Sequence, residues 1–129
     1  MIKKDPRQDL YDTIWQTVSP YARVYDLIPP KDTPYPFIRL GEYQGDDQAQ
    51  NKTAVFGTYF QMVHFWWTKE ARQDMTGTMG RIKQALREID KTPGGFQIGT
   101  MQISEQVIPD VDGTISLLHG VLVITAIFN

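Results

Sequence analysis

Cysteine is absent from this chain of 129 residues, and histidine occurs only twice, at His64 and His119. The lack of cysteine excludes disulfides, thiolate zinc sites and thiol catalysis. The two histidines are not at the spacing of a zinc-binding pair, and no Gly-x-Ser-x-Gly nucleophile elbow occurs. Both lie within expected strands, where a structural role is the commoner one. We therefore predict no catalytic residue, no metal ligand and no cofactor, in a protein that is not an enzyme.

The chain also lacks a strong charge of either sign. It carries 13 Lys and Arg against 15 Asp and Glu, a formal net charge of −2, so no basic field favours nucleic acid. No apolar run approaches the length of a membrane span, and the first residues carry no apolar signal core. Length and a hydrophobic share of 41% fit one domain over residues 1–129, used in a cytoplasm or assembled there.

An N-terminal helix is expected from about Asp9 to Val18, because apolar residues recur there at spacings of three and four. Asp5 before Pro6 is the predicted N-cap, and Ser19-Pro20 ends the helix. A short extended or turn-rich piece follows. Next comes a crossing that cannot be helical because of its prolines: Pro29, Pro30, Pro34 and Pro36. A strand from Phe37 to Tyr43 is predicted after it.

A polar run from Gln44 to Lys52 predicts a solvated loop. The strand that follows, from Thr53 to Trp67, carries large side chains on both faces. One face holds Tyr59, Gln61, Val63, Phe65 and Trp67, and the other holds Phe60, Met62, His64 and Trp66. A strand covered on both faces in so small a domain favours a subunit interface.

A second helix is predicted from Lys69 to Asp90, with an apolar stripe at Met75, Met79, Ile82, Leu86 and Ile89. Gly77 and Gly80 mark either a close approach to the sheet or a break near its start. Thr92-Pro93-Gly94-Gly95 is expected to end it.

Two C-terminal strands, Phe96–Val107 and Thr114–Phe128, are joined by a predicted turn at Pro109–Gly113 with a hairpin signal at Asp112-Gly113. The second strand is apolar on both faces. The order is α-β-β-α-β-β. We predict an α+β fold: an antiparallel sheet of about four strands with two main helices packed mostly on one face.

Other candidate sites have simpler explanations. Asp46-Asp47 lacks the spacing of a calcium loop. The basic residues of the second helix are diluted by acidic ones, which favours a solvent-facing helix over nucleic-acid binding. Adaptor binding through the basic side of this helix is a further alternative. An aromatic cluster, in which His64 would be the polar contact, is either a small-ligand or enzymatic pocket, or core and interface packing: Tyr59, Phe60, Phe65, Trp66 and Trp67.

Four features together carry a family resemblance. The helix leads into Val24-Tyr25-Asp26-Leu27-Ile28-Pro29, and Tyr35-Pro36-Phe37-Ile38-Arg39-Leu40-Gly41-Glu42 opens the first strand. The aromatic Val63-His64-Phe65-Trp66-Trp67-Thr68 leads into the second helix, and a long apolar strand closes the chain. In their order and spacing these features resemble the tail completion, or tail terminator, proteins of long-tailed bacteriophages and prophages.

The resemblance implies a structural, non-enzymatic protein of the virion. It would form a ring, commonly hexameric, on the head-proximal end of the tail, assembled in the host bacterial cytoplasm. Its partners would be other copies of itself, the tail tube protein and the head connector or stopper protein. The polar loop would supply docking residues: Asp46, Asp47, Gln48, Gln50, Asn51 and Lys52.

Overall fold

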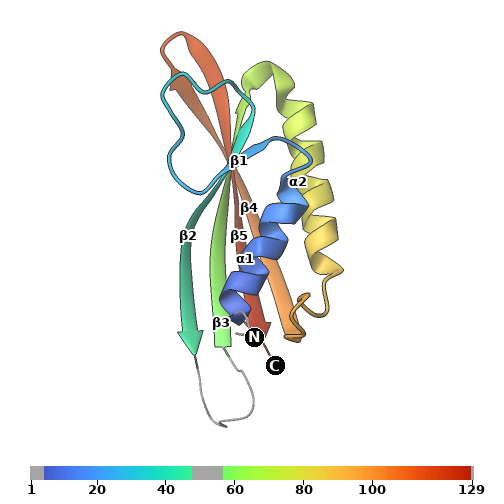
Figure 1. Cartoon of the computed structure of the whole chain (residues 1–129). Helices are drawn as coiled ribbons and strands as arrows, with labels where there is room; N and C mark the ends of the chain where they lie inside the picture. Colours follow the sequence, from blue (N-terminus) through green and yellow to red (C-terminus); the bar gives the residue numbers. More distant parts are fainter. Residues whose placement is uncertain (1–4, 48–56, 129) are drawn as a thin grey trace.

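The computed structural model describes residues 5–47 and 57–128, with the helices and strands drawn in Figure 1. The described residues form two α-helices, one 3-10 turn and five strands. Their bounds are α1 (Pro6–Val18), β1 (Arg23–Tyr25), β2 (Phe37–Asp47), β3 (Gly57–Thr68), the 3-10 turn η1 (Lys69–Ala71), α2 (Arg72–Arg87), β4 (Ile98–Asp112) and β5 (Ile115–Phe128).

The strands form one five-stranded sheet in the order β1-β2-β3-β5-β4. All neighbours are antiparallel except β1, which pairs parallel with the first residues of β2. The predicted α+β class is confirmed, but the sheet contains one strand more than the predicted order. The missing strand is β1, whose three residues are too few to show a period in the sequence.

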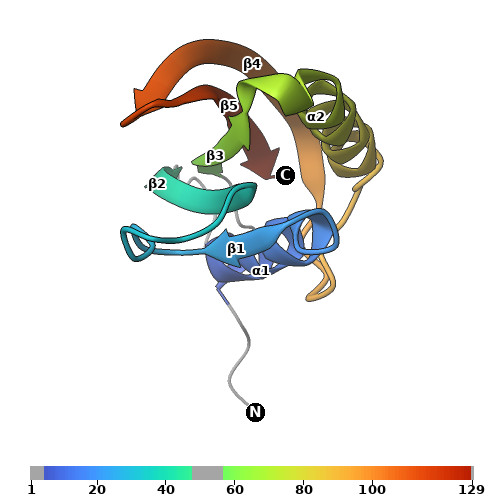
Figure 2. The same cartoon turned by 90° about the horizontal axis from the view of Figure 1, so that it is seen from above.

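Both helices lie on one face of the curved sheet, as Figure 2 shows from above. α1 packs its apolar stripe against β2 and α2, and α2 packs its own stripe against β3, β4 and β5. The fully buried residues are Leu10, Ile14 and Val18 from α1, Met75, Met79, Ile82 and Leu86 from α2, and Ile38, Val63, Phe65, Leu122, Ile124 and Ala126 from the sheet. The predicted stripe of α2 is confirmed at Met75, Met79, Ile82 and Leu86, while Ile89 lies beyond the end of the helix. The one-sided arrangement follows from the stripes of both helices.

The start of α1 is set by Asp5. Its carboxylate accepts a hydrogen bond of 2.8 Å from the backbone N–H of Arg7, and Pro6 occupies the first turn, where its missing N–H costs nothing. The helix begins at Pro6 rather than at Asp9, because the cap lies before the first apolar residue. Ser19 closes it as predicted.

The α2 helix ends at Arg87, earlier than the predicted Asp90, and it follows the short turn η1. Thr92 and Gly95 belong instead to a separate turn, in which the N–H of Gly95 donates to the Thr92 carbonyl. That turn is fastened to α1, because the buried carboxylate of Asp9 accepts a 2.6 Å hydrogen bond from the N–H of Gly94. The sequence therefore placed the helix end at the wrong turn.

The glycines inside α2 do not bring it close to the sheet. A Cβ at Gly80 would meet nothing within 4 Å, and one at Gly77 would meet only the Arg81 side chain. Nor do they break the helix, which is continuous through both positions. Both interpretations offered for these glycines are wrong.

Strand β2 continues to Asp47, so the loop predicted from Gln44 begins too early. Asp46 and Asp47 pair with Thr58 and Gly57 of β3. Backbone pairing needs no apolar side chains, which is why a polar run can extend a hairpin strand. The predicted second strand began at Thr53; β3 is described from Gly57, and residues 53–56 lie outside the described range.

A bulge interrupts β2 between Leu40 and Tyr43. The fully buried side-chain amide of Gln61 in β3 fills it and donates to the carbonyl oxygens of Gly41 at 3.1 Å and Met62 at 2.9 Å. The Tyr59 hydroxyl in turn donates to the Gln61 carbonyl at 2.7 Å. Gln61 belongs to the core face, as the alternation predicted, and its polar atoms are satisfied there.

The β4–β5 hairpin turns at Gly113 and Thr114, between the paired residues Asp112 and Ile115. Gly113 has a φ of 59°, as the first loop position of a type II′ turn requires. The hairpin signal is confirmed, but the strand does not end at Val107: Pro109 lies within β4. Proline is tolerated there because β4 is an edge strand. No described helix is long and apolar enough to span a membrane.

Candidate interaction surface

The outer face, as we call the sheet face opposite the helices, is an apolar surface that the described chain leaves partly uncovered. Its apolar side chains come mainly from β3 and β5, and Phe60 and Ile127 are 37% and 40% exposed. The face comprises Phe60, Met62, His64 and Trp66 of β3 and Leu117, His119, Val121, Val123 and Ile127 of β5. The predicted second cover for these strands is not supplied by the helices.

A cluster of stacked rings lies near the upper end of the outer face. Trp66 and His119 are directly opposite each other on β3 and β5, and their rings stack with centroids 3.8 Å apart. Nδ1 of His64 lies 2.8 Å from Nε2 of His119, and Nε2 of His64 lies 3.4 Å from a carboxylate oxygen of Glu42. The two histidines are within hydrogen-bond distance of each other across β3 and β5, and Glu42 extends the contact to β2.

Burial lowers the pKa of His119, and the neighbouring His64 lowers it further, while Asp110 acts in the opposite direction. The pKa of Glu42 is also lowered, first by a hydrogen bond from its own backbone and then by His64. The cluster thus has one imidazole with a lowered pKa beside a second imidazole that contacts the carboxylate of Glu42. Its contacts join three strands and bring no nucleophilic side chain into place, and no set of three metal-ligating side chains forms within the described ranges.

A groove of about 410 Å³ lies beside this cluster, between the proline crossing and the tip of the β4–β5 hairpin. The Tyr35 hydroxyl donates a 2.9 Å hydrogen bond to Asp112 across it, so the crossing is tied to the hairpin tip. Arg39 lines the groove, and its Nε is buried without a hydrogen-bond partner in the described structure. Ile28 and Val111, at the rim, are 79% and 60% exposed.

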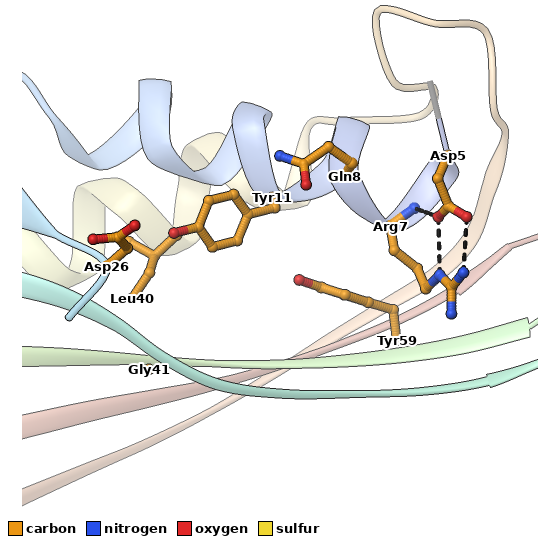
Figure 3. A pocket seen from close by; sticks show the side chains of 8 residues that line it. All are labelled: Asp5, Arg7, Gln8, Tyr11, Asp26, Leu40, Gly41 and Tyr59. Carbon is orange, nitrogen blue, oxygen red and sulfur yellow. Dashed lines mark hydrogen bonds and ion pairs between the residues drawn. The ribbon is translucent and has the colours of Figure 1, made fainter. Parts of the chain in front are cut away.

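A second, larger opening of about 690 Å³ lies between the start of α1 and strands β2 and β3 (Figure 3). Its lining is mostly polar, and Figure 3 shows the Asp5 carboxylate accepting hydrogen bonds from the backbone N–H and the guanidinium group of Arg7. The bonds from Arg7 hold the pKa of Asp5 at about 2. Burial raises the pKa of Tyr11, and the charge of Asp26 raises it further. With Asp5 and Arg7 paired to each other, this opening has the character of a helix–sheet junction.

The sequence-predicted docking residues are only partly placed. Asp46 and Asp47 lie in the last two positions of β2, next to the hairpin end. Gln48, Gln50, Asn51 and Lys52 lie outside the described residues. The docking role of this segment stays a prediction.

The predicted aromatic cluster is divided between the two faces of the sheet. Tyr59, Phe65 and Trp67 are buried under the helices, where Trp67 also donates a 2.8 Å hydrogen bond to Asp74 of α2. Phe60 and Trp66 point to the outer face. A single pocket walled by all five rings is therefore wrong, and the core-and-interface interpretation fits both groups.

Sequence reasoning predicted His64 and His119 as structural residues but did not bring them together. Their contact depends on the register Trp66↔His119 and His64↔Val121, which no local pattern specifies. The sequence held one signal for the surroundings of His64, a glycine inside the predicted first strand: Gly41 lies where a Cβ would be 2.7 Å from the His64 ring. Glycine in the middle of a strand often marks such a close approach.

No protein-family model matches this chain, and no curated protein matches it. Among solved structures, it matches a chain from a structure described as the virion of a native gene transfer agent particle, with a TM-score of 0.61. The alignment covers 94% of this chain and 89% of that chain, at 16% sequence identity. The fold is that of a chain in a virion. At this identity the likeness concerns the fold, which extends over nearly the whole of both chains.

Proposed function

We propose that this protein is a structural assembly component of a phage or prophage tail. It forms a ring on the head-proximal end, ends the growth of the tail tube and joins the tail to the head connector. The observation that carries this proposal is the nearly full-length fold match to a chain of a virion structure. The order of motifs from Val24 to Thr68, which resembles that of tail completion proteins, supports the same role.

The surface chemistry supports binding rather than catalysis. The outer face offers partly exposed apolar side chains, such as Phe60 and Ile127, next to a polar cluster that is internally satisfied. Surfaces of this kind, with an apolar centre and a polar rim, are typical of subunit contacts. The partners in this proposal are further copies of the chain, the tail tube protein and the connector, and no catalytic group or cofactor takes part.

Localisation in the particle tests the proposal. A tagged copy of the chain, expressed in cells that produce the particle, is expected at the neck between head and tail when purified particles are gold-labelled. Label along the whole tube, or particles without the chain, would contradict the role. A producer that carries Asp46→Lys and Asp47→Lys is expected to release more unattached heads and tails if these residues dock the connector, and unchanged yields would exclude them.

A further inference from the structure

We propose that copies of this chain join edge to edge, with residues 100–105 of β4 in one copy pairing antiparallel with residues 40–47 of β2 in the next. This inference rests on the proposed ring and names the surface that builds it. It makes the sheet of one copy continue into the sheet of the next.

Both strands have an unpaired edge. In the sheet as described, β4 is the last strand and has no neighbour beyond it. At the other side, β1 pairs only with Phe37–Arg39, so the rest of β2 has no strand outside it. In Figure 1 the lower part of β2 forms the free margin of the sheet. Unpaired backbone groups of this kind are ready to pair with another chain.

The backbone of β4 directs N–H and C=O groups away from β5, towards the free edge of the sheet. Asp112 and Ile115 flank a two-residue turn, so they bond to each other, and alternate residues of β4 then bond to β5. Pro109, which has no N–H to give, occupies one of the positions that face away from β5, in agreement with this phase. By the same alternation, Met101, Ile103 and Glu105 direct their N–H and C=O groups away from the sheet.

The free parts of the two edges lie at the same level. Following the pairs across the sheet, one row joins Leu40, Val63, Leu122 and Glu105. A lower row joins Asp47, Gly57, Phe128 and Ile98. The rows in which β1 covers β2 end at Gln106–Ile108 of β4, and Pro109 lies in the next row above them. Below those rows both β2 and β4 are open at the same level.

The strand directions also allow β4 of one copy to pair antiparallel with β2 of the next. Strands β2 and β5 run one way, and β3 and β4 run the other. A rotation about an axis parallel to the strands preserves both direction and level, so β4 of one copy meets β2 of the next antiparallel. The contact uses two different patches, and such a heterologous contact closes into a ring when the rotation permits.

The edge of β4 also lacks the charges that keep edges apart. Between Ile98 and Ile108 the single charged residue is Glu105, and its carboxylate lies 3.4 Å from the ammonium group of Lys83 in α2. Native edge strands that avoid pairing usually carry several charges or prolines. Here the proline is confined to the upper end.

A proline at position 105 tests the pairing. Glu105→Pro removes an outward N–H and leaves the β5 ladder intact, whereas Glu105→Ala loses the same side chain and keeps the N–H. In a concentration series followed by light scattering and native mass spectrometry, we expect the wild type and Glu105→Ala to assemble together. Glu105→Pro needs at least about tenfold more protein, from the loss of one or more hydrogen bonds of about 1 kcal/mol each. Equal assembly of the two variants, with equal circular dichroism, overturns the proposal.

Cross-linking tests the register inside the particle. The chain has no cysteine, so in a variant with Glu42→Cys on β2 and Ser104→Cys on β4 the two new thiols are the ones that can form a disulfide. Both positions lie on the outer face. Oxidised particles with both changes are expected to show a ladder of linked copies on a non-reducing gel, while either single change gives dimers at most. Particles that contain the double variant but show no ladder overturn the pairing.

The failure of this inference is distinguishable from failure of the proposed function. If Glu105→Pro supports normal, head-attached tails in producing cells, edge pairing is wrong and the tail role stands. If cells that lack the chain altogether produce normal tails, the tail role itself is wrong, whatever the edges do.

Discussion

His119 stacks on Trp66 with the ring planes 7° from parallel, and the same imidazole lies 2.8 Å from the ring nitrogen of His64. These three side chains join the two central strands β3 and β5 on the face that the helices leave uncovered. The contact places a titratable group inside a structural element, which gives the fold a pH dependence.

The lowered pKa of His119 has a defined sign. Burial and the neighbouring His64 hold its folded pKa below the ordinary value of 6.5. Between the folded pKa and the ordinary pKa, the unfolded chain binds more protons than the folded chain. The free energy of unfolding therefore has its full value above the ordinary pKa and falls as the pH drops through the folded pKa. We expect the free energy of unfolding, measured in urea, to decrease from about pH 7.5 to about pH 5.5.

Two variants separate the sources of this dependence. His119→Phe keeps a ring on Trp66 and cannot titrate, so its stability should change less over that interval. His64→Gln removes one of the two causes of the shift, and an intermediate slope is expected. A slope that is the same in His119→Phe and the wild type would show that another group is responsible.

Gln61 is expected to be a sensitive core position. Gln61→Leu keeps the approximate size of the side chain but removes the amide that serves the Gly41 and Met62 carbonyls at the bulge. Each buried group left without a partner costs about 1–3 kcal/mol. Urea denaturation should show a loss of that order, while Gln102→Leu, at an exposed position on β4, should change stability by less than about 0.5 kcal/mol.

Gly80→Ala is expected to stabilise the protein. The position is exposed inside α2, and a Cβ there meets nothing within 4 Å. Alanine in a helix interior is favoured over glycine by about 0.8–1 kcal/mol. A higher midpoint of thermal unfolding would agree with the geometry, and a lower one would show that the glycine is needed for a contact outside the isolated chain.

Gly94→Ala is expected to have the opposite effect. A Cβ at Gly94 would lie 2.6 Å from the buried Asp9 carboxylate, which accepts the Gly94 N–H. The turn must shift, and a charge-assisted hydrogen bond worth about 1.5–3 kcal/mol is weakened. Chemical denaturation should report a loss of that size, accompanied by faster hydrogen exchange in the first turns of α1. Unchanged exchange there would mean that Asp9 does not hold the turn.

Local signals in the sequence were sufficient for much of this fold. The cap at Asp5, the apolar stripe of α2 and the Asp112-Gly113 hairpin each depend on residues close together in the chain, and each is where the sequence placed it. The α+β class follows from their order. The same holds for the alternation that assigned Gln61 to the core face.

Other features depend on neighbouring strands and had no local signal. β1 forms because β2 offers it backbone hydrogen-bonding partners, and β2 and β4 run beyond their predicted ends because β3 and β5 continue beside them. The pairing of His64 with His119 and the level at which the two open edges coincide follow from register. Register is fixed by the assembled sheet, so the sequence assigned Phe60, Met62, His64 and Trp66 to one face of β3 but not the contacts that β5 and β2 add to it.

Electron microscopy of particles from a producer that lacks this chain tests the proposed function most directly. The proposed role predicts tails without heads, with lengths spread well beyond the normal value, and a return to normal when the chain is supplied again. Tails of normal length attached to heads in the absence of the chain would contradict it.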